Sequence, residues 1–276
     1  MKNINICIVL IAILFLSCEK IVDIDVPTIE PKLIIDASFQ VLFDQLPVTA
    51  NTVVKLKLSA DYFDETIPTV SNATVFLTNL SDNTIIPFSD LKNNGDYTPI
   101  ISFIPEDNRV YELTVIHKNE TYKGKANKVK STIIESVIQG DETLFSGEET
   151  EVKVAFTDNL EEENYYLFDF TNNLFTALED RFFNGTDYNF SFFYQEEEIE
   201  IPTNVTVRMS GITKDYFTYF RILQNQSGSG GGGPFESVPS SLLGNMINTT
   251  NENNFPLGYF HISETDTFNI ELAEKK

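Results

Sequence analysis

The chain has 276 residues, 23 of them Phe and 11 Tyr, and its formal net charge is -22 at pH 7. A charge of this sign repels nucleic-acid phosphates and anionic lipid headgroups, so it argues against nucleic-acid binding and against a purely electrostatic grip on a membrane. The abundance of Phe and Tyr favours half-buried β-strands, and the length allows one large domain or two ordinary ones.

The N-terminal residues have the pattern of a secretory signal peptide. Lys2 is followed by an unbroken apolar run over residues 6–16, shorter than the ~20 apolar residues of a membrane-spanning helix. The run ends in Leu16-Ser17-Cys18, which resembles a bacterial lipobox. We therefore interpret residues 1–17 as a signal peptide and Cys18 as the lipid attachment site. An ordinary signal followed by an incidental cysteine is the alternative.

The residues after this cysteine predict a flexible tether. Cys7 would leave with the signal peptide, so the mature chain would hold a single cysteine and no internal disulfide. Residues 19–31 are rich in acids and contain two prolines, and such a segment cannot bury enough apolar surface to fold alone. We expect residues 18–31 to connect the lipid anchor to the folded part.

Residues 32–128 predict an immunoglobulin-like antiparallel β-sandwich. Turn signals rich in Asn, Asp and Gly separate its runs, and short strands at this spacing are typical of a sandwich. Apolar and polar residues alternate with the two-residue period of half-buried strands in the runs 32–39, 53–60, 73–79, 96–103 and 109–118.

Residues 129–276 predict a second β-rich domain, barrel-like or sandwich-like, with one core helix. Its strands are expected at 150–158, 164–171, 186–195, 204–210, 258–263 and 267–272. The helix is expected near 213–225, where Tyr216, Phe220 and Leu223 recur at helical spacing. Phe217 lies beside them, and Thr213 is a suitable N-cap. The fold class is therefore expected to be mainly β with one α-helix.

A glycine-rich run, 228–233, follows this helix. A phosphate-binding loop needs its glycines before a helix, so that backbone N–H groups point at the anion. Here the order is reversed, no Gly-Lys-Ser/Thr sequence follows, and Pro234 removes a donor. The run therefore predicts a flexible loop rather than a phosphate site.

Residue patterns suited to catalysis or metal binding are sparse, and we predict no enzymatic activity, no cofactor and no metal. His117 and His261 lie in expected strands and are interpreted as packed or solvated residues. No Gly-x-Ser-x-Gly sequence positions a serine, and the mature chain is short of zinc ligands. The carboxylate runs 161–163 and 196–198 indicate solvated charged turns, with a weak calcium site as the functional alternative. A carboxylate-dependent hydrolase is the least favoured function, because it needs two acids facing each other across a cleft.

The segment 181–195 is the strongest candidate for binding. As a strand it places aromatic residues on one face, and Asn184-Gly185 predicts a tight turn within a hairpin. Such a face is commonly core. If exposed, it would form a stacking platform for sugar rings or a dock for a partner. The residues proposed for ligand or partner binding are Phe182, Phe183, Tyr188, Phe190, Phe192 and Tyr194.

A set of motifs in a fixed order resembles one protein family over essentially the full length. The chain begins with a lipoprotein-like signal and CEKIVDIDV, continues with PKLIIDASF and GDYTPIISF, and has a characteristic C-terminal part. The motif residues of that part are Pro239, Gly244, Asn245, Gly258, Tyr259 and Phe260. The chain thereby resembles a Bacteroidota outer-membrane lipoprotein family catalogued as domain of unknown function 4249.

The resemblance implies a location and a partner. Lipoproteins of this kind resemble, in genomic setting, surface proteins that accompany TonB-dependent outer-membrane transporters, and Glu19, Asp23 and Asp25 loosely resemble an export signal to the cell surface. We therefore expect a lipid-anchored protein at the cell surface that captures a peptide or glycan for such a transporter. A structural or adhesive surface lipoprotein without a transporter partner is the alternative.

Overall fold

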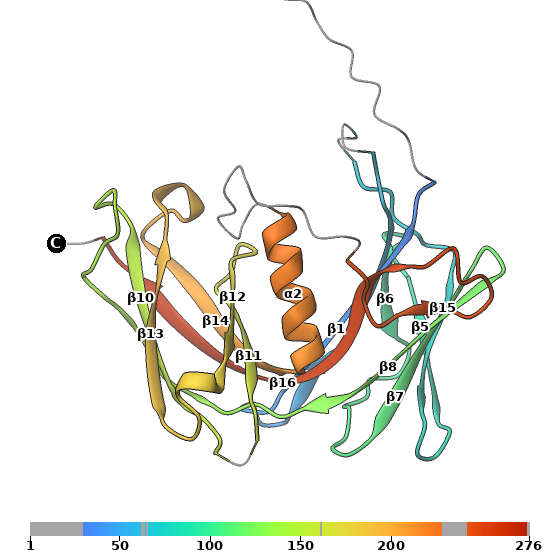
Figure 1. Ribbon diagram of the computed structural model, residues 1–276, viewed down its shortest axis with the longest axis horizontal. Helices are drawn as coiled ribbons and strands as arrows, with labels where there is room; N and C mark the ends of the chain where they lie inside the picture. Colours follow the sequence, from blue (N-terminus) through green and yellow to red (C-terminus); the bar gives the residue numbers. More distant parts are fainter. Residues whose placement is uncertain (1–29, 62–63, 65, 161, 228–241, 275–276) are drawn as a thin grey trace, which may run out of the picture. The chain divides into compact units, whose positions relative to one another are not determined.

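The computed structural model describes residues 30–274 except 62, 63, 65, 161 and 228–241. Residues Pro31–Lys276 form one compact unit. The predicted signal peptide, Cys18, the tether up to residue 29, the glycine-rich run and Pro239 lie outside the described residues. In the described part the chain is mainly β with one α-helix, which confirms the predicted fold class (Figure 1).

The strands and helices occur in the following order. The first half contains β1 (Leu33–Leu42), β2 (Thr49–Asn51), β3 (Val54–Leu58), β4 (Thr74–Asn79), β5 (Ile85–Ser89), β6 (Asp96–Pro99), β7 (Val110–His117), β8 (Glu120–Val129) and β9 (Ile134–Gln139). The second half contains β10 (Thr150–Thr157), β11 (Tyr165–Asp169), β12 (Phe175–Glu179), the 3-10 helix η1 (Asp180–Phe182), β13 (Asp187–Tyr194), the 3-10 helix η2 (Glu196–Glu198), β14 (Thr203–Ile212), α2 (Lys214–Gln226), β15 (Ile247–Asn248) and β16 (Leu257–Leu272).

Strand pairing closes the N-terminal strands into a ring, which we call the first region. Its strands follow the order β1-β3-β6-β5-β4-β7-β8, and β16 pairs with both ends of that series. β16 runs parallel to β1, from Leu257 opposite Ile34 to Thr265 opposite Leu42, and it meets β8 at Ile262. The predicted N-terminal sandwich is thus completed by a strand from the C-terminal end of the chain.

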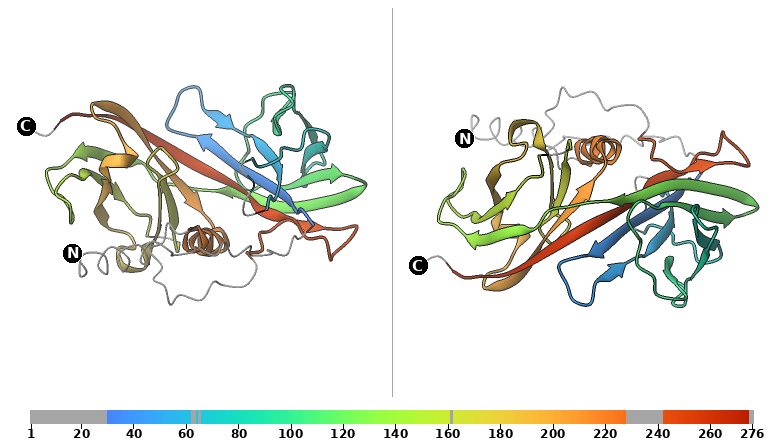
Figure 2. Two further views of the ribbon diagram at one scale, coloured as in Figure 1. Left: turned by 90° about the horizontal axis from the view of Figure 1, so that it is seen from above. Right: turned by 90° about the horizontal axis from the view of Figure 1, so that it is seen from below.

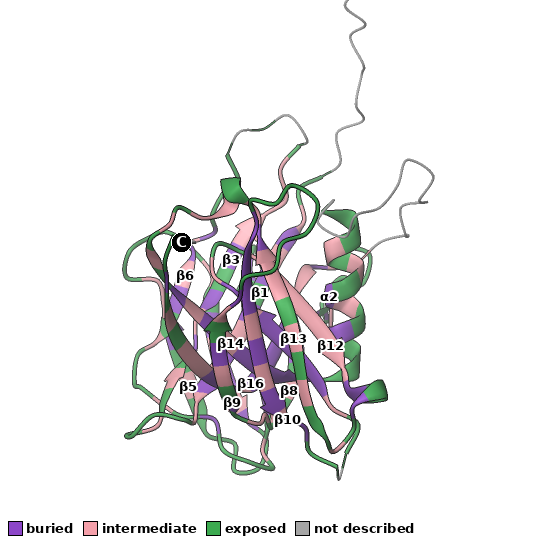
Figure 3. Cartoon of the chain, turned by 90° about the vertical axis from the view of Figure 1, so that its left-hand side faces the viewer, coloured by how far each residue is buried: buried purple, intermediate pink, exposed green. Residues whose placement is uncertain are grey.

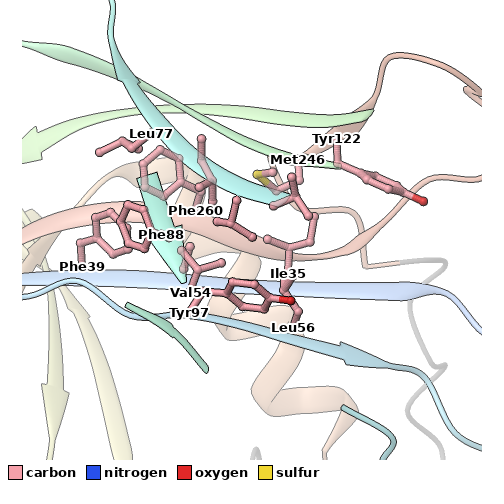
Figure 4. Packing of buried hydrophobic residues seen from close by; sticks show 14 of the residues in the cluster. Ile35, Phe39, Val54, Leu56, Leu77, Phe88, Tyr97, Tyr122, Met246 and Phe260 are labelled. Carbon is pink, nitrogen blue, oxygen red and sulfur yellow. The ribbon is translucent and has the colours of Figure 1, made fainter. Parts of the chain in front are cut away.

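Alternate residues of these strands share one hydrophobic core (Figure 4). The two-residue period of a strand sends every second side chain inward, which explains why Ile35 and Phe39 are fully buried. Phe39 stacks on Phe88 with ring centroids 5.9 Å apart and meets Phe260 edge-on at 5.4 Å. Phe260 comes from β16, so the closing strand is anchored in the core as well as by backbone hydrogen bonds.

The second region consists of β9 to β14 and the C-terminal half of β16. One sheet has the order β13-β10-β9, and it packs against the strands β12-β11-β14-β16 of the larger sheet. The core between them is aromatic: Phe170 stacks on Phe192 with centroids 3.9 Å apart, and Phe168 meets Phe190 edge-on at 5.0 Å. Along β13 the residues from Asp187 to Phe192 alternate between exposed and half-buried, whereas β10 beside it is largely buried (Figure 3).

The two regions share β16, a single strand of 16 residues. Its first half pairs with β1, and its second half pairs antiparallel with β14, from Thr265 opposite Ser210 to Leu272 opposite Thr203. In Figure 2 this strand, drawn in red, runs from one region into the other. The predicted boundary between residues 128 and 129 stays a prediction; the pairing adds that one strand belongs to both regions.

Several local predictions differ from the structure. The strands expected at 258–263 and 267–272 are one continuous β16. The strand expected at 96–103 ends at Pro99, and Ile100 and Ile101 beyond it are exposed. The hairpin expected over 181–195 is instead the 3-10 helix η1, a turn and β13, although Gly185 does have the positive φ of a turn residue.

Among the described residues, no helix is long and apolar enough to cross a membrane.

Candidate functional site

The helix α2 forms where the sequence predicts it. Thr213 is the N-cap, with extended backbone angles, and its hydroxyl accepts a hydrogen bond from the Tyr216 backbone N–H at 3.2 Å. Asp215 in the first turn lies at the positive end of the helix dipole. These features fix where the helix begins and therefore which residues face the sheet.

The two sides of α2 have different roles. Tyr216, Phe217 and Phe220 are buried against β11 and neighbouring strands. Tyr165 of β11 packs on Phe217 at 5.1 Å, and Phe175 of β12 packs on Phe220 at 5.5 Å. A second stripe at the spacing i, i+3, i+4 and i+7 lines a pocket beside the helix: Asp215, Thr218, Tyr219 and Ile222. Leu223, predicted as a core residue, is exposed.

A short segment, residues 242–245, forms the opposite wall of the pocket. The Asn245 side chain of this segment pairs with the β16 backbone as a residue of a neighbouring strand would. Its Oδ1 accepts from the Phe260 N–H at 2.8 Å, and its Nδ2 donates to the Phe260 carbonyl at 2.7 Å. The same amide nitrogen donates to the Lys125 carbonyl at 3.2 Å. Asn245 thus holds this wall on β16 and on the β8 backbone.

The two motif glycines permit close backbone approaches. A Cβ on Gly244 would collide with the carbonyl of Gly258, so the wall can lie directly on β16 only because residue 244 lacks a side chain. Gly258 has φ of +96°, and a Cβ there would collide with the Ile35 carbonyl of β1. Gly244, Asn245 and Gly258 thus bring three backbone segments together next to the pocket.

Tyrosine rings form the floor. Tyr259 of β16 lies 4.9 Å from the Tyr216 ring and 5.0 Å from the Tyr219 ring, measured between centroids. Burial raises the pKa of all three phenols, and for Tyr216 and Tyr219 the Asp36 carboxylate adds to the shift. The pKa of Tyr219 rises to about 12. At neutral pH these hydroxyls are therefore uncharged and able to donate hydrogen bonds.

A buried histidine lies behind the floor. His261 stacks on the Tyr216 ring at 4.0 Å, and its Nδ1 is 3.1 Å from the Ser263 hydroxyl. Its Nε2 has no hydrogen-bond partner, and burial lowers its pKa to about 3. The imidazole is thus neutral at physiological pH and serves as a packed strand residue.

Together these residues line what we call the α2 pocket, an open depression with a volume of about 450 Å³. This volume is within the range of small-molecule sites. Its lining combines aliphatic side chains (Ile222, Leu242 and Leu243), two tyrosines and one carboxylate, Asp215. The arrangement can hold a ligand with an apolar body and hydroxyl or amine groups, and the overall negative charge disfavours anions.

The predicted aromatic binding residues lie mostly in the second core. Phe183 and Tyr194 are buried, and Tyr188, Phe190 and Phe192 are half-buried against the same cluster. Phe183 stacks on Tyr188 at 4.0 Å. Phe182 alone in this set is strongly exposed, at 86%. The structure therefore places the shared face in the core and does not gather these rings into an exposed platform.

Several buried carboxylates accept backbone hydrogen bonds. Asp158 accepts from the Tyr166 hydroxyl at 2.5 Å and from the Gly185 N–H at 2.8 Å. Glu149 accepts from three N–H groups of its own loop, and these bonds lower its pKa to about 2. Within the described residues, no group of three or more His, Cys, Asp or Glu is arranged to hold a metal.

The charged runs and the second histidine also have structural surroundings. Glu198 accepts the Gln195 N–H at 2.8 Å in a capping box, and Glu163 lies 3.6 Å from Lys214 Nζ. Glu161 lies outside the described residues. His117 is buried in β7, and burial lowers its pKa. These side chains accordingly cap and pack the fold.

Sequence reasoning missed the α2 pocket itself. It identified the buried stripe of the helix and the motif around Gly244 and Tyr259 as separate features. A signal was present, because Tyr219 and Ile222 form a second apolar stripe on an otherwise polar helix side. What the sequence could not show is that residues 242–245 come back beside that stripe.

Comparisons with known proteins add one family. The model of a family described as Domain of unknown function (DUF4249) matches residues 19–269. No curated protein matches the chain. Among solved structures it is similar to chicken interferon gamma receptor alpha chain (12% identity, 67% of this chain and 90% of that chain, TM-score 0.18) and to the FN1–FN3 domains of chicken CNTN1 (13% identity, 67% and 60%, TM-score 0.17). TM-scores this low carry no argument, so the description of the fold rests on the strand pairing of the chain itself.

Proposed function

The chain belongs to the family described as Domain of unknown function (DUF4249), and from this premise we propose that it is a lipid-anchored outer-membrane protein that captures a ligand for a TonB-dependent transporter. The lipobox-like Leu16-Ser17-Cys18 supports the anchor, and the acidic tether supports display of the folded part away from the membrane.

The α2 pocket is the observation that carries the capture function. Its wall is held against β16, because Asn245 is hydrogen-bonded to that strand and the two motif glycines allow tight backbone packing. Its floor offers uncharged tyrosine hydroxyls, and Asp215 offers an acceptor. Such a lining favours a neutral or cationic ligand with an apolar body, and among ligands of this kind we propose a short peptide or a glycan.

The transporter partner is tested by affinity isolation. The full-length, lipidated, tagged protein is recovered from native outer membranes, and the co-isolated proteins are identified by mass spectrometry. The proposal predicts a TonB-dependent barrel in near-stoichiometric amount. Recovery of the protein alone would contradict it and favour the structural or adhesive alternative. A Cys18→Ser variant, which lacks the acylated residue, should leave the membrane fraction.

The pocket is tested separately with matched variants. Tyr219→Ala removes a half-buried residue of the pocket floor while keeping a good helix former, and Phe145→Ala removes a fully exposed ring from another loop. Binding of peptide and glycan libraries to the full-length protein is measured by calorimetry for each hit. We expect Tyr219→Ala to weaken binding about tenfold or more, and Phe145→Ala to leave it unchanged. Equal affinities for both variants would place the ligand elsewhere.

A further inference from the structure

The strand β13 has one unpaired edge in the described part of the chain. Its strand partner there is β10, over the full length from Thr150 opposite Tyr194 to Thr157 opposite Asp187. The strands of the first region each have neighbours on both sides. The other edge strands of the second region are β9, which pairs with β10 alone, and β12, which pairs with β11 alone.

The pairing register identifies which backbone groups face the open side. The Asp158 N–H donates to the Thr186 carbonyl at 3.1 Å, so residue 186 and every second residue after it point toward β10. The N–H and C=O groups that point away therefore belong to Asp187, Asn189, Ser191 and Phe193. Asn189 and Ser191 are exposed. These groups form a row suited to pairing with another extended chain.

Side chains already hydrogen-bond to backbone groups just beyond the C-terminal end of β13 and at the start of β12, the edge strand of the other sheet. Beyond Tyr194, the Gln195 N–H donates to the Glu198 carboxylate, and the Glu198 carbonyl accepts from Asn172. On β12, the Phe175 carbonyl accepts from the Gln224 side chain of α2 at 3.0 Å. Phe175 is the first residue of β12, whereas among the described residues no such bond reaches the outward backbone groups of β13 from Asp187 to Phe193.

The sequence of β13 does not protect this edge. Natural proteins protect open edges with Lys, Pro, bulges or very short strands. The segment DYNFSFFY is eight residues long, contains no Lys, Pro or Gly, and is rich in residues of high β-propensity. A strand of this composition with a free edge is prone to pair with another chain, and a soluble protein retains it at the risk of aggregation.

The inner face of β13 offers half-buried aromatic rings that apolar side chains of a partner strand could contact. Tyr188, Phe190 and Phe192 are half-buried, and they pack on Phe168 and Phe170 from one side. An incoming strand would place every second side chain on this face, next to the exposed parts of the rings. Apolar side chains at those positions would complete the burial.

The surroundings are acidic. At one end the Thr157 hydroxyl lies 2.5 Å from Glu135 Oε1 and 2.8 Å from Asp187 Oδ1. At the other end, hydrogen bonding with Glu148 and repulsion from its carboxylate raise the pKa of Glu196. Two acids held this close at an exposed site favour the arrival of a positive charge.

We propose that the free edge of β13 binds an extended segment of a partner protein by β-augmentation, and that this segment alternates apolar residues with Lys or Arg. Backbone pairing with Asn189 and Ser191 supplies the register, the aromatic face selects apolar side chains, and the flanking carboxylates select cations. The interaction lies outside the α2 pocket and goes beyond the proposed function.

The experiment is site-specific crosslinking in native membranes. Phe193, whose ring lies on the outer face beside the edge, is replaced by photoreactive benzoylphenylalanine in the full-length lipidated protein, and the crosslinked peptide is sequenced by mass spectrometry. Asn189→Pro removes an outward N–H without touching the β10 ladder, and Asn189→Ala removes the same side chain but keeps the N–H. Thermal unfolding of both variants checks that they fold.

We expect one crosslinked segment with alternating apolar and basic residues. Its yield should fall about tenfold in Asn189→Pro, stay unchanged in Asn189→Ala, and decrease with added salt. Tyr219→Ala should leave the yield unchanged, so failure of the pocket hypothesis and failure of this one are distinguishable. A yield insensitive to Asn189→Pro, a crosslink to a second copy of this chain, or no protein crosslink would overturn the proposal.

Discussion

The first and second regions are both built of β-strands, but the strands close into a ring only in the first region. In the first region β16 closes the series from β1 to β8, so each strand of the ring has two neighbours. In the second region the larger sheet ends at β12 and the smaller sheet ends at β13 and β9, and the outer edges of these three strands pair with no strand among the described residues. The comparison suggests a division of labour in which the closed region supplies a stable base and the open one supplies contact surfaces.

The cores of the two regions also differ in their content of aliphatic and aromatic side chains. The first is built largely of aliphatic side chains around a few rings, such as Phe39 and Phe88. The second is a continuous set of stacked and edge-on rings reaching from Phe156 to Phe192. Its outermost rings stay half-exposed because β13 has no further strand beside it.

Truncation of a central ring in each core gives the largest expected effect. Phe168→Ala in the second region and Phe39→Ala in the first should each lower the free energy of unfolding by about 3–5 kcal/mol. Since both regions share β16, calorimetry of either full-length variant should show one cooperative transition. Two separate transitions would mean that the regions fold independently and would weaken the role given to β16.

The shared strand also carries a pH-sensitive residue. Unfolded His261 binds a proton below about pH 6.5, whereas the folded pKa is lowered to about 3 by burial. Stability should therefore fall as the pH falls from about 6.5 toward 3, by up to about 1.4 kcal/mol per pH unit. His261→Gln should flatten this slope in urea titrations at several pH values. His117, buried in the first region, shifts in the same direction and keeps part of the slope.

Substitution of two glycines tests how much the close approach of the β1 and β16 backbones contributes to stability. Gly258 and Gly147 both have positive φ, but a Cβ on Gly258 meets the Ile35 carbonyl, whereas a Cβ on Gly147 meets nothing within 4 Å. Gly147→Ala should cost about 1 kcal/mol, and Gly258→Ala about 2 kcal/mol more from the backbone collision. Chemical denaturation measures both. Equal costs would show that β1 and β16 can separate without penalty.

The smallest effect is expected at the exposed end of the aromatic segment. Phe182 is exposed, so Phe182→Ala should change stability by less than about 0.5 kcal/mol. It should also leave ligand binding in the α2 pocket unchanged. A clear loss of peptide or glycan binding in this variant would instead restore Phe182 as a binding residue.

Local patterns in the sequence predicted the elements that follow one clear periodicity. The helix α2 and its Thr213 cap, and strands such as β3 and β7, appear where alternation or helical spacing placed them. β8 was missed because its residues are largely polar, and β5 because it contains a proline. Short-range pattern therefore succeeded where one face is apolar and the other polar.

The continuity of β16 could not be inferred from the sequence. Its centre, Glu264-Thr265-Asp266, has the composition of a polar turn. In the structure the Thr265 hydroxyl lies 2.8 Å from the Ser210 hydroxyl, and Asp266 accepts the Ile134 N–H. These partners are distant in the chain. The α2 pocket was missed for the same reason, since residues 242–245 reach it only through the hydrogen bonds of Asn245 to β16.

Residue-resolved amide hydrogen exchange of the isolated full-length protein tests the central contrast most directly. The closed ring predicts slow exchange along all of β7, which is paired on both sides. The open edge predicts an alternating pattern in β13, with slow exchange at Tyr188, Phe190 and Phe192 and fast exchange at Asn189, Ser191 and Phe193. Uniformly slow exchange along β13 would contradict the free edge, and with it the division of labour between the two regions.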